Sequence, residues 1–187
     1  HLDMRYDDLV AQRIEKSLQM SCVIASEAED PGQRLGIEFV KYIEKSGTPI
    51  DIFGSDNLHG FKNYRGALPA FDTRKGILPY RYTLAVENCS EINYFTEKLI
   101  DVILGECLCF YWGCPNLEEY IDPAAFIRLP LDDFALSLHI MENAMRDNEH
   151  AQRLDAIRAE KRRILDEYQF FPTLARVIHG HRLANSL

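Results

Sequence analysis

The sequence predicts an α/β domain of Rossmann-like architecture, in which a mostly parallel sheet carries helices on both faces. Strand-like and helix-like segments alternate along the chain, which is the pattern of a parallel sheet with crossover helices. Residues 80–113 show it most clearly. They read as strand, loop, helix and strand, and a right-handed crossover makes two such strands parallel. The 187 residues are enough for one well-buried domain and hardly enough for two.

The overall composition is that of an ordinary globular protein, with 47% hydrophobic and 27% charged residues. A net charge of −8 argues against nucleic acid as a partner, although an anionic nucleotide can bind where a helix terminus and local cations set the potential. No apolar run has the length of a membrane span, and no signal-peptide pattern is present. His1-Leu2-Asp3 before Met4 resembles a cloning scar, so no native targeting segment is visible. We expect a cytoplasmic or membrane-peripheral protein.

The N-terminal segment, residues 1–19, is expected to be this scar followed by an amphipathic or linker helix. The helix is predicted over residues 4–19, where apolar residues recur on one face among charges: Leu9, Val10, Ile14 and Leu18. We place the α/β domain over residues 20–187, beginning with a short apolar strand at 20–25.

The first β-helix-β unit follows directly. Pro31 and Gly32 turn the chain after an acidic loop, and the next helix ends at Gly47. Apolar residues recur at helical spacing between these points: Ile37, Val40, Tyr42 and Ile43. Residues 49–53 form the second predicted strand, which completes the unit.

Residues 54–76 are long, polar and rich in glycine. A loop of that length in a compact domain is usually functional, mobile or contains a short helix. Beyond the central unit the pattern predicts a short helix, a strand, two long helices and a last helical turn: residues 115–120, 126–129, 131–145, 149–168 and 174–178.

The strand, loop, helix and strand of residues 80–113 indicate where the candidate site lies. A buried strand over residues 82–86 precedes a helix that begins near Thr96 and ends at Gly105, and residues 107–112 form the next strand. In parallel sheets, ligands bind beyond the carboxyl ends of strands, where helices begin. Polar residues gather at that edge: Glu87, Asn88, Asn93, Tyr94, Thr96, Glu97 and Lys98.

These residue types suit a nucleotide. A diphosphate is well placed at the free N–H groups of the helix that Thr96-Glu97-Lys98 opens, and Lys98 adds a positive charge. The Glu97 carboxylate suits a pair of ribose hydroxyls, because it accepts two hydrogen bonds at once. Arg34, just past the first strand and the Pro-Gly turn, would place a guanidinium near phosphate oxygens. The alternatives are an ordinary capped helix with solvated charges and a surface arginine.

Other chemistries lack a motif. Cys107, Cys109 and Cys114 raise the question of a zinc site, because Cys107 and Cys109 share a strand face. A structural zinc ion needs four ligands, and no His or further Cys lies at a ligand spacing nearby. Buried free thiols are therefore the better interpretation. Five cysteines are an odd number, which favours reduced thiols. His179 and His181 are a weak metal signal. No Ser-His-Asp set, P-loop or Gly-x-Gly-x-x-Gly motif is present.

An ordered series of motifs carries a family resemblance: Tyr80-Arg81-Tyr82, Val86-Glu87-Asn88, Thr96-Glu97-Lys98, Phe110-Tyr111-Trp112 and Gly113-Cys114-Pro115-Asn116. It resembles the C-terminal half of glycosyltransferase family 10, the α-1,3/α-1,4-fucosyltransferases. The similarity covers roughly residues 21–134, with Arg81 and Val86 as mild departures from that family's Lys and Phe.

The resemblance implies the C-terminal, donor-binding lobe of a two-lobed (GT-B) inverting glycosyltransferase. The donor would be GDP-fucose, and the family's nucleotide contacts carry over to Asn88, Tyr94, Glu97 and Lys98, with an arginine near Arg34 on the diphosphate. No metal would be obligatory, since no Asp-x-Asp motif is present. In the family the general base lies in the N-terminal lobe, so no catalytic residue is assigned.

That implied lobe and a glycan acceptor are the expected partners beside the nucleotide sugar. Two alternatives stay open: a transferase that uses a different nucleotide sugar, and a noncatalytic domain that binds a nucleotide or a glycan.

Overall fold

A computed structural model describes residues 2, 4–11, 13–69 and 72–168. Its centre is a six-stranded sheet in the order β3-β2-β1-β4-β5-β6, with every neighbouring pair parallel. The strands are β1 (Leu18–Val23), β2 (Asp51–Gly54), β3 (Tyr64–Ala67), β4 (Tyr80–Val86), β5 (Leu108–Trp112) and β6 (Phe126–Arg128). The predicted parallel sheet is therefore confirmed, including all five strands expected from the sequence.

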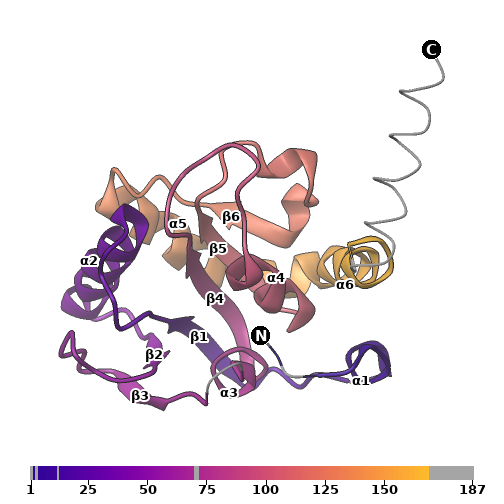
Figure 1. Cartoon of the computed structure of the whole chain (residues 1–187), viewed down its shortest axis with the longest axis horizontal. Helices are drawn as coiled ribbons and strands as arrows, with labels where there is room; N and C mark the ends of the chain where they lie inside the picture. Colours follow the sequence, from indigo (N-terminus) through magenta and orange to yellow (C-terminus); the bar gives the residue numbers. More distant parts are fainter. Residues whose placement is uncertain (1, 3, 12, 70–71, 169–187) are drawn as a thin grey trace.

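Helices cover both faces of this sheet, and Figure 1 shows α4 in front of it and α5 behind. The helices are α1 (Tyr6–Ala11), α2 (Pro31–Ser46), α3 (Arg74–Ile77), α4 (Glu97–Leu104), α5 (Phe134–Arg146) and α6 (Glu149–Glu167), with short 3-10 turns η1 (Leu117–Glu119) and η2 (Pro123–Ala125). Successive side chains of β4 point to opposite faces of the sheet and so contact different helices. The Tyr82 hydroxyl donates to Ala144 O in α5, 3.0 Å away, whereas Thr83 meets Ser21, whose hydroxyl donates to Gly76 O in α3.

The N-terminal helix is shorter than predicted. The expected helix over residues 4–19 is limited to Tyr6–Ala11, and Leu18 already belongs to β1. The Leu18 N–H donates to Pro79 O at 2.9 Å, and Leu18 lies opposite Tyr80 in the ladder between β1 and β4. Pairing with a long central strand outweighs the weak local preference for a helix. Two of the apolar residues that predicted the longer helix, Leu9 and Ile14, are nevertheless buried.

The long segment 54–76 holds a sixth strand that the sequence pattern missed. β3 pairs in parallel with β2 at the sheet edge. It has only four residues, of which Gly66 has φ +128°, so neither length nor side-chain alternation marks it as a strand. α3 is the short helix that we considered for this segment, and η1 lies where residues 115–120 predicted one. The helical turn predicted at 174–178 lies outside the described residues.

Gly32, in the first turn of α2, brings that helix against the end of β4. Its N–H donates to Asn88 O at 2.8 Å, and a Cβ added at Gly32 would lie 1.9 Å from Glu87 O. Backbone oxygen is not free to move aside, because it belongs to the loop that follows a buried strand. The start of α2 and the loop after β4 are thereby fixed relative to each other.

Gly32→Ala is therefore expected to lower the free energy of unfolding by about 1–3 kcal/mol, the usual cost of overpacking. Gly36→Ala, one turn later, is the control. Its Cβ would lie 3.3 Å from the Val86 side chain, and the gain in helix propensity offsets that tight contact to within about 1 kcal/mol. Urea unfolding of the two variants measures the difference. Equal stabilities would contradict the close approach at Gly32.

Candidate functional site

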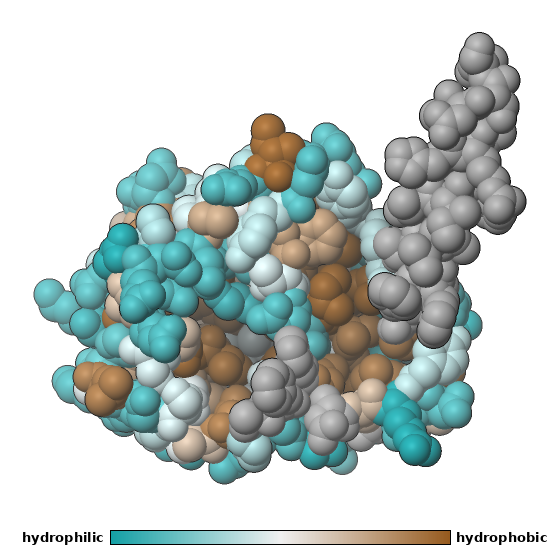
Figure 2. Space-filling model, viewed as in Figure 1, coloured by the Kyte–Doolittle hydropathy of each residue, from teal (hydrophilic) through white to brown (hydrophobic). Residues whose placement is uncertain are grey.

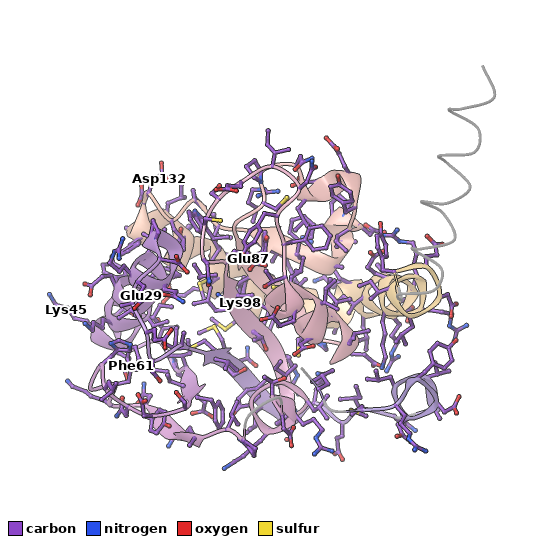
Figure 3. All side chains as sticks on the ribbon, viewed as in Figure 1. Glu29, Lys45, Phe61, Glu87, Lys98 and Asp132 are labelled. Atoms are coloured by element: carbon purple, nitrogen blue, oxygen red, sulfur yellow. The ribbon has the colours of Figure 1, made fainter. Side chains whose placement is uncertain are left out.

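The strand order reverses between β1 and β4. The chain winds from β1 to β3 on one side of the sheet and from β4 to β6 on the other, so β1 and β4 are neighbours at the switch point. In open α/β sheets the ligand crevice lies outside the carboxyl ends of such a pair. α2 follows β1 and α4 follows β4, so two helix N-termini flank this crevice. Figure 3 shows Glu87 and Lys98 close together there, with Glu29 on the α2 side.

Glu87, the first residue after β4, holds the start of α4. Its carboxylate is fully buried and accepts from the Thr96 N–H at 2.9 Å and the Thr96 hydroxyl at 2.7 Å. Thr96 is the N-cap of α4, and its hydroxyl oxygen accepts from the Lys98 N–H at 3.3 Å. Burial raises the pKa of Glu87, against the lowering effect of the Thr96 hydrogen bonds and of Lys98. Glu87 therefore acts on the site through Thr96.

Lys98 turns its ammonium back over the end of β4. Nζ donates to Val86 O at 3.1 Å and to Asn88 Oδ1 at 2.5 Å. Burial lowers the pKa of Lys98, while the Glu87 and Glu97 carboxylates raise it. Lys98 lines both a cavity of about 390 Å³ and a small one of about 30 Å³ beside Gly32 at the start of α2. Its charge thus lies between the two helix N-termini.

Glu97 and Asn88 complete this group. Glu97 is exposed at the first position of α4 and lines the larger cavity, and Asn88 holds Lys98 through its side-chain oxygen. The structure thus brings together five of the residues that the sequence singled out: Glu87, Asn88, Thr96, Glu97 and Lys98.

Arg34 forms its hydrogen bonds with the backbone of the preceding loop instead. It is exposed on α2, and its Nη1 donates to Ala28 O at 2.9 Å and to Glu29 O at 2.5 Å. These bonds brace the loop between β1 and α2, so Arg34 shapes the opposite side of the crevice from α4.

Tyr94 lies in the loop that joins β4 to α4, and Asn93 gives that loop its shape. Asn93 has φ +65°, and its Oδ1 accepts from Asn116 Nδ2 at 2.9 Å and from the Tyr120 hydroxyl at 2.7 Å. Tyr94 is half-buried, and burial raises its pKa, as does the nearby Glu87 carboxylate. The loop is therefore docked on residues 116–120, which the sequence did not indicate.

The larger cavity is also lined by four polar residues that the sequence analysis missed, and two of them, Thr73 and Asp101, contact each other. The Thr73 hydroxyl donates to Asp101 Oδ2 at 3.1 Å. Asp101 follows Glu97 by four residues on α4 and so shares its face, a signal that was available in the sequence. Thr73 lies in the long segment before α3, where no local pattern indicates it.

Nothing among the described residues forms a metal-binding group of three or more His, Cys, Asp or Glu side chains. All five cysteines are free thiols, and Cys107 Sγ donates to Ile77 O and Tyr80 O at 3.3 and 3.2 Å. His179 and His181 lie outside the described residues. Within the described part of the chain, no helix is long and apolar enough to span a membrane.

Comparisons with known proteins point to one family. Residues 14–154 match the family model described as glycosyltransferase family 10 (fucosyltransferase), C-terminal. The chain is 24% identical to the α-(1,3)-fucosyltransferase FucT of Helicobacter pylori, over 67% of this chain and 29% of that protein.

Solved structures of α1,3-fucosyltransferases share the fold. One is matched with a TM-score of 0.57 and 22% identity over 73% of this chain and 38% of that one. A structure with GDP-fucose has a TM-score of 0.57 and 18% identity, covering 84% and 49% of the two chains. A structure with GDP has a TM-score of 0.58 and 18% identity, covering 88% and 50%. The chain thus spans half or less of the length of these relatives.

Proposed function

Because the chain belongs to glycosyltransferase family 10, the fucosyltransferases, we propose that it is the lobe that binds the nucleotide-sugar donor. One observation carries this proposal. The N-terminus of α4, with Glu97 and Lys98, lies at the switch point of a parallel sheet and lines a cavity of about 390 Å³. The two solved relatives with GDP-fucose and with GDP support a GDP-sugar as the ligand class.

Each residue of the group has a part in this proposal. The diphosphate lies at the first N–H groups of α4, where the helix dipole and the Lys98 ammonium stabilise its charge. Glu97 accepts the ribose hydroxyls, and Asn88 orients Lys98. Glu87 and Thr96 position the helix start, because both Glu87 oxygens accept from Thr96. We propose that Arg34, on α2, and Tyr94, in the loop between β4 and α4, contact the donor from the two sides of the crevice.

The proposed reaction transfers fucose from GDP-fucose to a glycan hydroxyl with inversion. The bond from the sugar carbon to the β-phosphate oxygen breaks as the acceptor oxygen bonds to that carbon, and a carboxylate base takes the acceptor proton. We assign this base and the acceptor site to an N-terminal lobe beyond the present chain. The 187-residue chain is therefore expected to bind nucleotide and to transfer sugar poorly or not at all by itself.

Calorimetry with the chain tests this proposal. GDP is expected to bind more tightly than UDP, with an affinity that a chelator leaves unchanged, because Lys98 and the helix N-terminus neutralise the diphosphate without a metal. A preference for UDP or CDP would instead favour a transferase with a different nucleotide sugar. Binding that is lost with the chelator would contradict the proposed charge neutralisation. Binding of glycans without binding of any nucleotide would favour a noncatalytic glycan-binding domain.

A further inference from the structure

The larger cavity continues along α4 beyond the proposed ribose and diphosphate positions. α4 supplies Glu97 and Lys98 to its lining and, one turn later, Asp101. Residues four apart on a helix share a face and are separated by about 6 Å along its axis, so Glu97 and Asp101 face the same space. Glu97 is exposed, whereas Asp101 is only 6% exposed. Asp101 is thus the more deeply placed of the two carboxylates.

Most of the remaining lining is apolar, and Figure 2 shows apolar side chains gathered in the recessed centre of this face. The lining includes Val23, Ile24, Leu68, Pro69, Ile77 and Val102. A volume of about 390 Å³ falls within the range of small-molecule sites, in which an apolar wall with a few placed polar groups is usual. Such a wall accommodates a flat ring, and a single buried carboxylate selects a ring with N–H donors along one edge.

Thr73 orients that carboxylate. Its hydroxyl donates to Asp101 Oδ2 at 3.1 Å, and it lines the cavity from the segment before α3. A carboxylate offers about four lone-pair sites, so it accepts several donors at once. The bond from Thr73 is therefore one of the contacts that orient the Asp101 carboxylate toward a ligand.

We propose that Asp101 determines the base specificity of the site by accepting the ring N1–H and the 2-amino N–H of guanine. This inference rests on the proposed function, which it deepens. Guanine presents those two donors side by side. Uracil presents one N–H between two carbonyl oxygens, and adenine and cytosine present an amino group beside an unprotonated ring nitrogen. A buried carboxylate repels these neighbouring lone pairs, so it selects for guanine and against the other bases.

Titration of GDP and inosine diphosphate into three proteins tests this assignment, because inosine differs from guanosine only by lacking the 2-amino group. The parent chain is expected to prefer GDP by about tenfold or more, the effect of a hydrogen bond to a charged group. Asp101→Asn, which retains a polar partner for Thr73, should bind GDP about tenfold or more weakly and lose the preference. Glu97→Gln is the control: it should weaken both ligands alike and keep the preference.

The outcomes separate this inference from the proposed function. If the parent binds neither diphosphate, both fail. If the parent binds GDP and inosine diphosphate equally, the role of Asp101 is overturned while nucleotide binding stands, and this result requires no variant to fold. An Asp101→Asn protein that melts like the parent but retains the preference, or loses both ligands equally, also overturns it. Equal loss of both ligands would indicate that Asp101 stabilises the segment that contains Thr73 and does not contact the base.

Discussion

Replacing Lys98 with methionine is expected to weaken GDP binding about 10- to 150-fold, equivalent to about 1.5–3 kcal/mol for a hydrogen bond to a charged group. Methionine preserves the apolar stem and removes only the ammonium that we assign to the diphosphate. Calorimetric titration of GDP measures the loss. Lys45→Met is the matched control, because Lys45 is an exposed lysine in the last turn of α2 and should leave GDP affinity unchanged.

A second ligand separates the charge effect from a general loss of the site. Lys98→Met should spare guanosine, which lacks the diphosphate, whereas Glu97→Ala should weaken guanosine and GDP alike, since Glu97 is assigned to the ribose. Equal affinities of both variants and the parent for both ligands would refute the site and favour an ordinary capped helix.

The structure also changes the expected stability of the Lys98 variant. In an ordinary capped helix with solvated charges, the loss of Lys98 would hardly affect folding. Lys98 is instead half-buried and donates to Val86 O and Asn88 Oδ1. We therefore expect the free energy of unfolding to fall by about 1 kcal/mol in Lys98→Met, and thermal melts must accompany the titrations.

Glu106→Gln is expected to destabilise the fold by about 3–5 kcal/mol, the largest effect that we predict for this chain. Glu106, just after α4, is 6% exposed and bonds Lys161 Nζ and Arg158 Nε of α6, each at 2.9 Å. The Lys161 side chain is itself only 6% exposed, so removing the carboxylate charge leaves a buried ammonium without its counter-charge. Urea unfolding gives the loss directly.

Two further proteins make this prediction specific. Glu118→Gln removes one partner of an exposed pair with Arg128 and should cost less than about 1 kcal/mol. Lys161→Met added to Glu106→Gln removes the stranded ammonium and should restore part of the stability. A Glu106→Gln protein as stable as the parent would show that the ion pair with Lys161 contributes nothing to the free energy of unfolding.

The same ion pair predicts a pH dependence. Burial opposes ionisation of Glu106, but its bonds to Lys161 and Arg158 outweigh burial and hold its pKa below the usual value. A depressed folded-state pKa contributes stability above the unfolded-state pKa, and this contribution is lost as the pH falls through the folded-state pKa. The parent should therefore lose more stability than Glu106→Gln when acidified below about pH 4.3.

The backbone at the site was predictable from the sequence because its signals are local. Apolar spacing and a terminal glycine define α2 and α4, and short apolar runs define β4 and β5. Gly47, for example, ends α2 in the left-handed conformation with φ +87°, as its position in the sequence indicates. The chirality of crossover connections then makes the strands parallel and brings Glu87, Asn88 and the start of α4 to one edge.

The sequence by itself thus determined the parallel sheet, the edge at which the candidate site lies and most of the residues gathered there. Only the tertiary structure decided that Glu87 is buried beneath Thr96, that Lys98 is held by Asn88, that residues 64–67 form an edge strand and that Asp101 meets Thr73. The physical reason is that local periodicity fixes the backbone of each element, whereas the partner of a polar side chain depends on burial and on residues brought close only by packing.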